Sequence, residues 1–450
     1  METQQTQSFW QRNSIMIKAV VVGFLILILL IPTGFIQSLV QERQERQQQV
    51  IAEVSSKWAS GQKISGPFLL VPYVTNEKDE KGNPYTVTRN AYFLPEQLNI
   101  NGKLIPEIRN RSIYKVALYK TDMKLSGTFA PLDFKTLNID PASVKWNELR
   151  FCMGLTDNRG IAEQLQLHFN NATIEMNPDL PANTIASAGV NAMLPASIAT
   201  DTGSHTFSVN LKLNGSERLF FTPVGKQTQV QLQSDYNNAS FTGLYLPAES
   251  PSLDSGFNAK WNISYFTRSF PQSWKDEKVN IDDAAFGVEL LQGMDSYSKT
   301  MRSVKYALLF IALTFCIFFF IEVLQKRSVH PLQYVLVGFA LCIFYTLLLS
   351  VSEYIGFDFG YAIADVATVG LITLYIQSVF GKWSIAAGFF VFLSALYGMI
   401  YILIQLQDGS LLFGSIGLFI LLAVVMYYSR KIDWSGGRKQ VTESIPVTGE

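Results

Sequence analysis

The sequence predicts a polytopic α-helical membrane protein with six transmembrane helices and a large inserted extracytoplasmic β-rich domain, an antiparallel sandwich. Three observations predict this: six apolar runs, short connections between the last five, and a long middle segment with strand periodicity. The apolar runs cover residues 19–36, 306–323, 335–352, 362–380, 385–404 and 411–428. Each approaches the roughly 20 residues that a helix needs to cross a hydrocarbon core. Because lipid offers no partners for backbone hydrogen bonds, we expect every run to be a spanning helix.

The first helix is predicted to be an uncleaved anchor. Arg12 and Lys18 precede its apolar run, as in a signal peptide, but the run is longer than a usual signal core. It continues into the charged segment 41–46, and no small-x-small cleavage site comes before that segment. Apolar residues then recur at helical spacing through 50–58, so we expect the helix to extend and pack this stripe on the outer domain.

The distribution of basic residues predicts the topology, because Lys and Arg near helix ends mark the cytoplasmic side. The connections 325–330 and 381–383 and the tail after Arg430 are basic, whereas the connection 353–358 is acidic. We therefore expect both termini in the cytoplasm, the protein in the bacterial inner membrane, and the large domain in the periplasm. The predicted segments are a tail and first helix (1–40), the periplasmic domain (41–303), a five-helix bundle (304–430) and a cytoplasmic tail (431–450).

The periplasmic segment is predicted to be rich in half-buried strands. Apolar and polar residues alternate at 207–213 and again at 257–265, which is the period of a strand with one face in a core. Turn signals such as Asn101-Gly102 and Asn214-Gly215 separate the candidate strands. Many short strands with such punctuation are typical of antiparallel sandwiches.

Composition excludes several classes of function. The 450-residue chain has 36 basic and 36 acidic residues, so it lacks the basic surface of a nucleic-acid binder. Its three cysteines provide no disulfide framework, because Cys316 and Cys342 fall in predicted helices and leave Cys152 alone outside. We expect Cys152 to be a small buried hydrophobe.

No sequence motif indicates an enzyme, a metal site or a cofactor site. The three histidines are not part of a His-Glu-x-x-His zinc motif or a Cys/His cluster. Gly-x-Ser-x-Gly and Gly-x-Gly-x-x-Gly are also absent from the sequence. We therefore predict no catalytic residues and no cofactor.

Four carboxylates lie within or beside the predicted spanning helices: Glu322, Glu353, Asp358 and Asp365. Charged groups in lipid are costly and are functional candidates by default. All four lie near an interface, where a carboxylate reaches water and headgroups. Glu322 also has Lys326 four residues on, at the spacing of a helical ion pair. Both anchoring or helix pairing and a proton or ion relay stay open for these residues.

Further candidates come from a run at the start of the third helix, where proline suits the first turn. This run reads His330-Pro331-Leu332-Gln333-Tyr334, and Ser352-Glu353 follows at the end of the same helix. The two runs resemble the carboxy-terminal bundle of the CreD family of inner-membrane proteins. Tyr354 departs from this resemblance, since the family tends to have histidine there, which weakens a Glu–His proton relay.

The resemblance also extends through the outer domain and covers nearly the whole chain. Its clearest run there is Asp157-Asn158-Arg159-Gly160-Ile161, which makes Asp157, Arg159 and Gly160 a candidate periplasmic motif. Similar runs occur at 65–67, 93–96, 111–114, 127–129, 240–241 and 246–247.

The resemblance implies a role in cell-envelope integrity. In some bacteria the CreB–CreC two-component system controls the family, which is linked to stress responses to β-lactams and colicins. The resemblance implies no reaction and supplies no catalytic residues.

Three functional hypotheses follow. The first is a non-catalytic protein that is embedded in the lipid bilayer and whose periplasmic domain binds an envelope component or a partner protein. The second is a transporter or channel with the bundle as conduit, although no charged midplane pair of the kind such sites use is evident. The third is an intramembrane enzyme acting on lipid-linked substrates, with Glu322 and His330, or Glu353 and Asp358, as acid and base. Oligomeric state stays open.

Overall fold

The computed structural model describes residues 14–79, 83–181, 184–200, 203–249, 252–253, 256–276, 279–290, 295–325, 327–406 and 410–430. The chain splits into two compact units, a β-rich unit, Gln47–Gln292, and a helical unit made of Met1–Arg46 and Gly293–Glu450. The first helix, α2 (Ser14–Trp58), contributes residues to both units.

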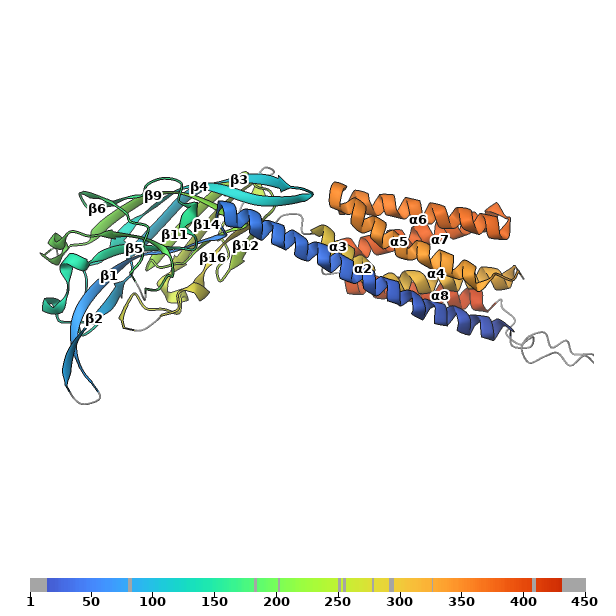
Figure 1. Cartoon of the computed structure of the whole chain (residues 1–450), viewed down its shortest axis with the longest axis horizontal. Coiled ribbons are helices and arrows are strands. Elements are labelled where there is room, and N and C mark those ends of the chain that lie inside the picture. The colour runs from blue at the N-terminus through green and yellow to red at the C-terminus, as the bar shows by residue number, and fades with distance from the viewer. Residues whose placement is uncertain are drawn as a thin grey trace, which may run out of the picture. The chain divides into compact units, whose positions relative to one another are not determined.

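In the described part of the β-rich unit, the strands form two sheets of eight strands each. Figure 1 shows these strands together at one end of the picture. The first sheet runs β12 (Ala239–Gly243), β16 (Phe286–Leu290), β10 (Arg218–Phe221), β1 (Gln62–Lys78), β2 (Pro84–Phe93) and β15 (Ser273–Lys275), with β5 (Arg150–Leu155) paired to β1 and β8 (Gly189–Met193) paired to β5. The second runs β13 (Ser252–Leu253), β14 (Gly256–Ser264), β11 (Gln227–Ser234), β3 (Gln97–Arg111), β4 (Tyr114–Phe129), β9 (His205–Ser216), β6 (Gln166–Phe169) and β7 (Ala172–Glu175).

Most strand pairs are antiparallel, as predicted, but both sheets are mixed. The strands β1 and β10 pair in parallel, and so do β3 and β11. The prediction of a purely antiparallel sandwich is therefore wrong. It rested on the short turns between neighbouring strands, whereas these two pairs join strands far apart in the chain, where the intervening elements serve as the crossover.

One hydrophobic core lies between the two sheets. The predicted alternation in 207–213 and 257–265 appears as buried residues on the inner faces of β9 and β14. Trp261 of the second sheet lies 5.5 Å, between ring centroids, from Phe286 of the first, and Phe129 lies 6.2 Å from Phe151 in the same way. Such interdigitated aromatic rings account for the face-to-face packing of the sheets.

Among its described residues, the helical unit consists of the amino-terminal part of α2 and six further helices. These are α3 (Asp295–Lys305), α4 (Ala307–Leu324), α5 (Pro331–Ile355), α6 (Phe357–Phe380), α7 (Trp383–Gln405) and α8 (Ser410–Ser429). Among the described residues, five helices are long and apolar enough to cross a membrane, namely α2 and α4 to α7. The sixth predicted run forms α8, and a membrane crossing by α8 stays a prediction.

The predicted acidic connection 353–358 is almost entirely helical, which corrects the sequence analysis. The helix α5 continues to Ile355, and α6 begins at Phe357. Only Gly356 separates them, and its φ of 87° is one that glycine adopts at little cost. The sequence boundary was drawn at the first charged residue, but charged side chains at a helix end reach water without ending the helix.

Cys152 provides a test of the packing of the β-rich unit. Its side chain is fully buried, as predicted, and burial raises the pKa of its thiol to about 12. In a variant with Cys316→Ala and Cys342→Ala, we expect no labelling by a maleimide at pH 8 until denaturant is added, because the reactive thiolate is neither populated nor accessible. Adding Lys212→Cys, at an exposed position, should restore labelling at once. Rapid labelling of Cys152 in the folded chain would contradict the described core.

Candidate functional site

The first candidate site surrounds Glu322, in the last turn of α4. Its side chain is only 3% exposed, and its carboxylate accepts three hydrogen bonds. Lys18 Nζ of α2 donates at 2.5 Å, the Tyr334 hydroxyl of α5 at 2.7 Å, and the Val329 amide of the α4–α5 connection at 3.0 Å. The burial of a carboxylate is tolerated when it is paired and hydrogen-bonded in this way.

The run 330–334 builds the start of α5 beside this carboxylate. His330 Nδ1 accepts from the Leu332 amide at 3.2 Å, and the Gln333 side chain accepts from the His330 amide at 3.1 Å. Pro331 occupies the first helical position, where its missing N–H costs nothing. This reciprocal cap explains why the helix starts here and holds Tyr334 against Glu322.

A small pocket of about 180 Å³ adjoins the Glu322 network. Apolar side chains of α2 form one wall, and Lys18, Ser328 and His330 contribute polar groups. Lys18 also donates to Ser328 Oγ at 3.1 Å. Lys18 is not among the predicted site residues, because in the sequence it is only a positive charge that flanks the first apolar run. The predicted partner Lys326 lies outside the described residues.

The remaining membrane carboxylates are engaged by other helices. Glu353 accepts from the Tyr297 hydroxyl of α3 at 2.9 Å, and Arg43 of α2 lies 3.9 Å away. Asp358 accepts from the Tyr401 hydroxyl of α7 at 2.9 Å and from Gln405 Nε2. Within the described residues, no contact joins Glu353 to Asp358. The arrangement fits helix pairing better than a shared acid–base site.

Asp365 differs from these carboxylates. Its Oδ1 atom is buried and has no hydrogen-bond partner in the described part of the chain. The hydroxyl groups of Tyr345 and Tyr397 are likewise buried and unpartnered among the described residues. Tyr361, one turn before Asp365, donates instead to the Tyr397 carbonyl at 2.8 Å. Unsatisfied polar groups inside a helical unit are costly, which sets Asp365 apart from the paired carboxylates.

Asp157 of the candidate motif links the end of α2 to the strands of the β-rich unit. It caps a short 3₁₀ turn, Asn158–Gly160, and accepts from Ser60 N at 3.1 Å and Ser60 Oγ at 3.2 Å. Arg159 donates to Asp157 through both Nε and Nη2, at 2.9 and 2.7 Å, and through Nη1 to the Ser56 carbonyl at 2.7 Å. The motif therefore fixes the point where the helix passes into β1.

Gly160 is required at this junction for steric reasons. A Cβ atom there would lie 2.4 Å from the Asn214 carbonyl oxygen and 2.5 Å from Gln62 Nε2. The Gln62 amide donates to the Asp157 and Asn214 carbonyls, at 2.9 and 3.2 Å. A larger residue would push apart the hydrogen bonds that hold the first residue of β1.

The predicted apolar stripe of the first helix packs on the β-rich unit, as expected. Ile51 forms a buried cluster with Val116 and Leu118 of β4, and Val54 and Trp58 pack against it. Arg109 also lies over the Trp58 ring, 4.4 Å from its centroid, a cation–π contact. The stripe and the Asp157 motif together hold the last turns of α2 on the sheet.

The Asp157 junction can be tested by hydrogen exchange on the full chain. Asp157→Asn should speed exchange of backbone amides in 56–64 by about tenfold or more, since it weakens charged hydrogen bonds of about 1.5–3 kcal/mol. The control Asp133→Asn alters an exposed carboxylate that binds only its own turn, and it should leave 56–64 unchanged. Equal exchange in both variants would mean that the motif does not hold this junction.

The pH dependence of this effect has a definite sign. The hydrogen bonds from Arg159 lower the pKa of Asp157. A lowered folded-state pKa stabilises the fold above the ordinary Asp pKa, and the stabilisation is lost only as pH falls through the lowered value. The difference between wild type and Asp157→Asn should therefore be the same at pH 6 and pH 8.

The Glu322 network can be tested with a double-mutant cycle. Lys18→Met and Glu322→Gln should each lower the thermal stability of the purified full chain, while the double variant should lose less than the sum. We expect a coupling of about 1–2 kcal/mol, because Lys18 is partly exposed and Glu322 is buried. The matched cycle of Arg43→Met and Glu353→Gln should give a smaller coupling energy, because Arg43 Nε lies 3.9 Å from Glu353 Oε1. Strict additivity of Lys18→Met and Glu322→Gln would contradict the ion pair.

Comparison with known proteins agrees with the resemblance drawn from the sequence. The family described as inner membrane protein CreD matches residues 14–435. The chain is 30% identical over 421 residues to the inner membrane protein CreD of Escherichia coli strain K12, and the match covers 91% of each chain. The predicted resemblance is thereby confirmed. This chain belongs to the CreD family of inner membrane proteins.

Proposed function

We propose that this chain is a multi-pass inner-membrane protein that supports cell-envelope integrity without catalysing a reaction. Its β-rich unit would bind an envelope component or a partner protein in the periplasm. The observation that carries the proposal is that the described motif residues make structural contacts within the fold. Glu322, His330, Gln333, Tyr334 and Asp157 are all engaged in contacts that hold helices and strands together.

The proposed topology has six spanning helices, both termini in the cytoplasm and the β-rich unit in the periplasm. It is supported by where basic side chains lie in the helical unit. Arg327 Nη1 donates to the Val379 carbonyl near the end of α6, at 3.2 Å, and Lys382 Nζ donates to Gln325 Oε1 after α4, at 3.1 Å. With Lys18, these cations lie at one end of the unit, which the positive-inside rule assigns to the cytoplasm.

A second candidate function, transport of protons or ions, rests on Asp365. This carboxylate and the buried hydroxyls of Tyr345 and Tyr397 have no partners among the described residues. Ionisable groups inside a spanning helix are functional candidates. Transport would require the Asp365 carboxylate itself, whereas a scaffold would require only the folded bundle.

Complementation of a deletion strain separates these functions. Into a strain that lacks its own copy of the gene, we would return the wild type, Asp365→Asn, Glu353→Gln and His330→Ala, and measure resistance to detergent and to a β-lactam. We expect all three variants to rescue when present at normal membrane abundance, because none removes a side chain that the proposed binding function uses.

The control compares membrane abundance of each variant by immunoblot. A variant that is present at the wild-type level and rescues nothing would overturn the non-catalytic proposal. Loss of rescue by Asp365→Asn alone would favour transport.

A further inference from the structure

The hairpin of β1 and β2 has an open edge. β2 pairs along its whole length with the second part of β1, from Phe93 with Leu69 to Pro84 with Lys78. On its other side, β2 pairs with β15 only at residues 91–93. Among the described residues, 84–89 have no strand beside them other than β1. Figure 1 shows this hairpin, in blue, extending past the other strands of its sheet.

Two hydrogen bonds determine which backbone groups face this edge. The Leu94 amide donates to the Gln272 carbonyl at 2.9 Å, and the Asp276 amide donates to the Asn90 carbonyl at 3.3 Å. Backbone groups of a strand alternate in direction, so every second residue faces the same side. Thr88 and Thr86 therefore turn their N–H and C=O groups outward. Pro84 is two residues before Thr86, so it faces the same edge. Proline has no N–H group to leave unpaired there, which suits the end of an edge strand.

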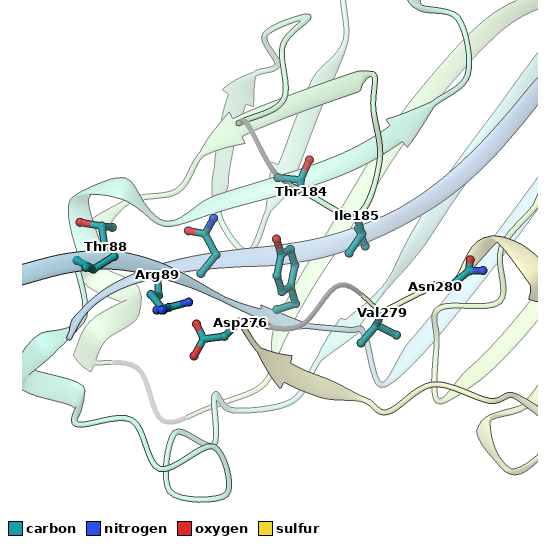
Figure 2. Close-up of a pocket in the computed structure, with 10 residues that line it drawn as sticks. Thr88, Arg89, Thr184, Ile185, Asp276, Val279 and Asn280 are labelled. Atoms are coloured by element: carbon teal, nitrogen blue, oxygen red, sulfur yellow. The ribbon is translucent and has the colours of Figure 1, made fainter. Parts of the chain in front are cut away.

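A pocket of about 480 Å³ runs beside the open edge (Figure 2). Strand residues 87–90 line it together with Thr184, Ile185, Asp276 and Asn280. Side chains from both faces of β2 contribute, so the pocket lies along the edge of the sheet. Residues 86–90 span roughly 13 Å of extended chain, the length of a short added strand.

The charges around the pocket favour a basic ligand. Arg89 is paired with Glu77 through two of its nitrogens, with Nε at 2.6 Å. Asp276 accepts from the Tyr73 hydroxyl at 2.8 Å, and burial with this hydrogen bond raises the pKa of Tyr73, so the hydroxyl stays a donor. Because Glu77 already neutralises Arg89, the Asp276 carboxylate is the lining charge that no ion pair among the described residues balances.

Asp276 is also held in an unusual backbone conformation. Its φ is 63°, in the left-handed region that residues other than glycine rarely adopt. Its side chain is exposed toward the pocket, and Figure 2 shows the carboxylate and the Arg89 guanidinium on neighbouring sides of it. Such a conformation persists when the surroundings impose it, and it is often found at ligand sites.

We propose that the open edge of β2 binds an extended polypeptide segment of another protein as an added strand, with a basic side chain of that segment against Asp276. The proposal rests on the proposed function and names the class of partner. Backbone groups of Thr86 and Thr88 would supply the hydrogen bonds, as in other cases of strand addition. The negative charge at Asp276 would favour a lysine or arginine near the centre of the segment.

The test uses the purified full-length protein in lipid nanodiscs. A phage-displayed library of random decapeptides would be selected on it, and enriched peptides would be synthesised and measured by fluorescence anisotropy. We expect enriched sequences with alternating side chains and a central basic residue. Thr88→Pro should weaken their binding by about tenfold or more, because it removes an outward N–H without breaking a bond to β1.

Matched variants make the result specific. Thr88→Val keeps the backbone N–H and the β-branched shape, and it should bind as the wild type does. Asp276→Asn should weaken the binding of peptides that contain the central lysine. It should leave unchanged the binding of the same peptides with norleucine in place of that lysine. Thr86→Pro provides a second edge variant, and unchanged thermal unfolding would verify that each variant folds.

Several outcomes would overturn this inference. One is a selection that enriches no peptide above phage without an insert, and another is equal binding by Thr88→Pro and wild type. Dimerisation that is lost in Thr88→Pro, without peptide binding, would assign the edge to a second copy of the chain. In all these cases, continued rescue of the deletion strain by Thr88→Pro would leave the proposed envelope function intact, so the two failures are distinguishable.

Discussion

The helical unit depends on the requirement that a buried carboxylate be fully paired. Glu322 sits among apolar helices, where an isolated charge would cost several kcal/mol. Its donors come from three places in the chain: Lys18, Tyr334 and the Val329 amide. Satisfying one carboxylate therefore brings α2, the end of α4 and the start of α5 together. Asp157 does the same in the β-rich unit, where it accepts from Ser60, just after α2, and from Arg159, which also donates to the Ser56 carbonyl of α2.

The described residues on which the family resemblance was drawn make contacts within the fold, and the proposed binding edge lies elsewhere. His330 and Gln333 cap a helix, and Gly160 lets its 3₁₀ turn lie close to the Asn214 carbonyl of β9 and the Gln62 side chain of β1. By contrast, Thr88 and Asp276 belong to no motif in the sequence. A scaffold of this kind would let relatives keep the same architecture while their β-rich units differ in what they bind. Function in such a chain is better sought at unpaired backbone than at its most recognisable residues.

Local patterns predicted the elements well, and their pairing poorly. Alternation at 207–213 and 257–265 gave the inner faces of β9 and β14 correctly, because burial of one face imposes a period of two. The parallel partners of β1 and β3 could not be predicted, because strand choice depends on packing across more than a hundred residues of chain. The ion pair of Lys18 and Glu322, 304 residues apart, left no local signal either. The direction of the backbone groups along the edge of β2 could be assigned only from the hydrogen bonds of Asn90 and Leu94 in the structure.

An open strand edge is a hazard that proteins normally suppress, because it can pair with any extended chain. The β2 edge carries several of the usual protections. Pro84 lacks a donor, Arg89 and Glu77 place charges on the hairpin, and Asp276 closes one end by bonding Asn90. Among the described residues of this edge, Thr86 and Thr88 keep their outward N–H groups unpaired, and Thr88 lines the pocket. An edge limited to about two residues with outward hydrogen-bonding groups is too short for promiscuous sheet extension. It therefore depends on the pocket walls for affinity, and that dependence would make it selective.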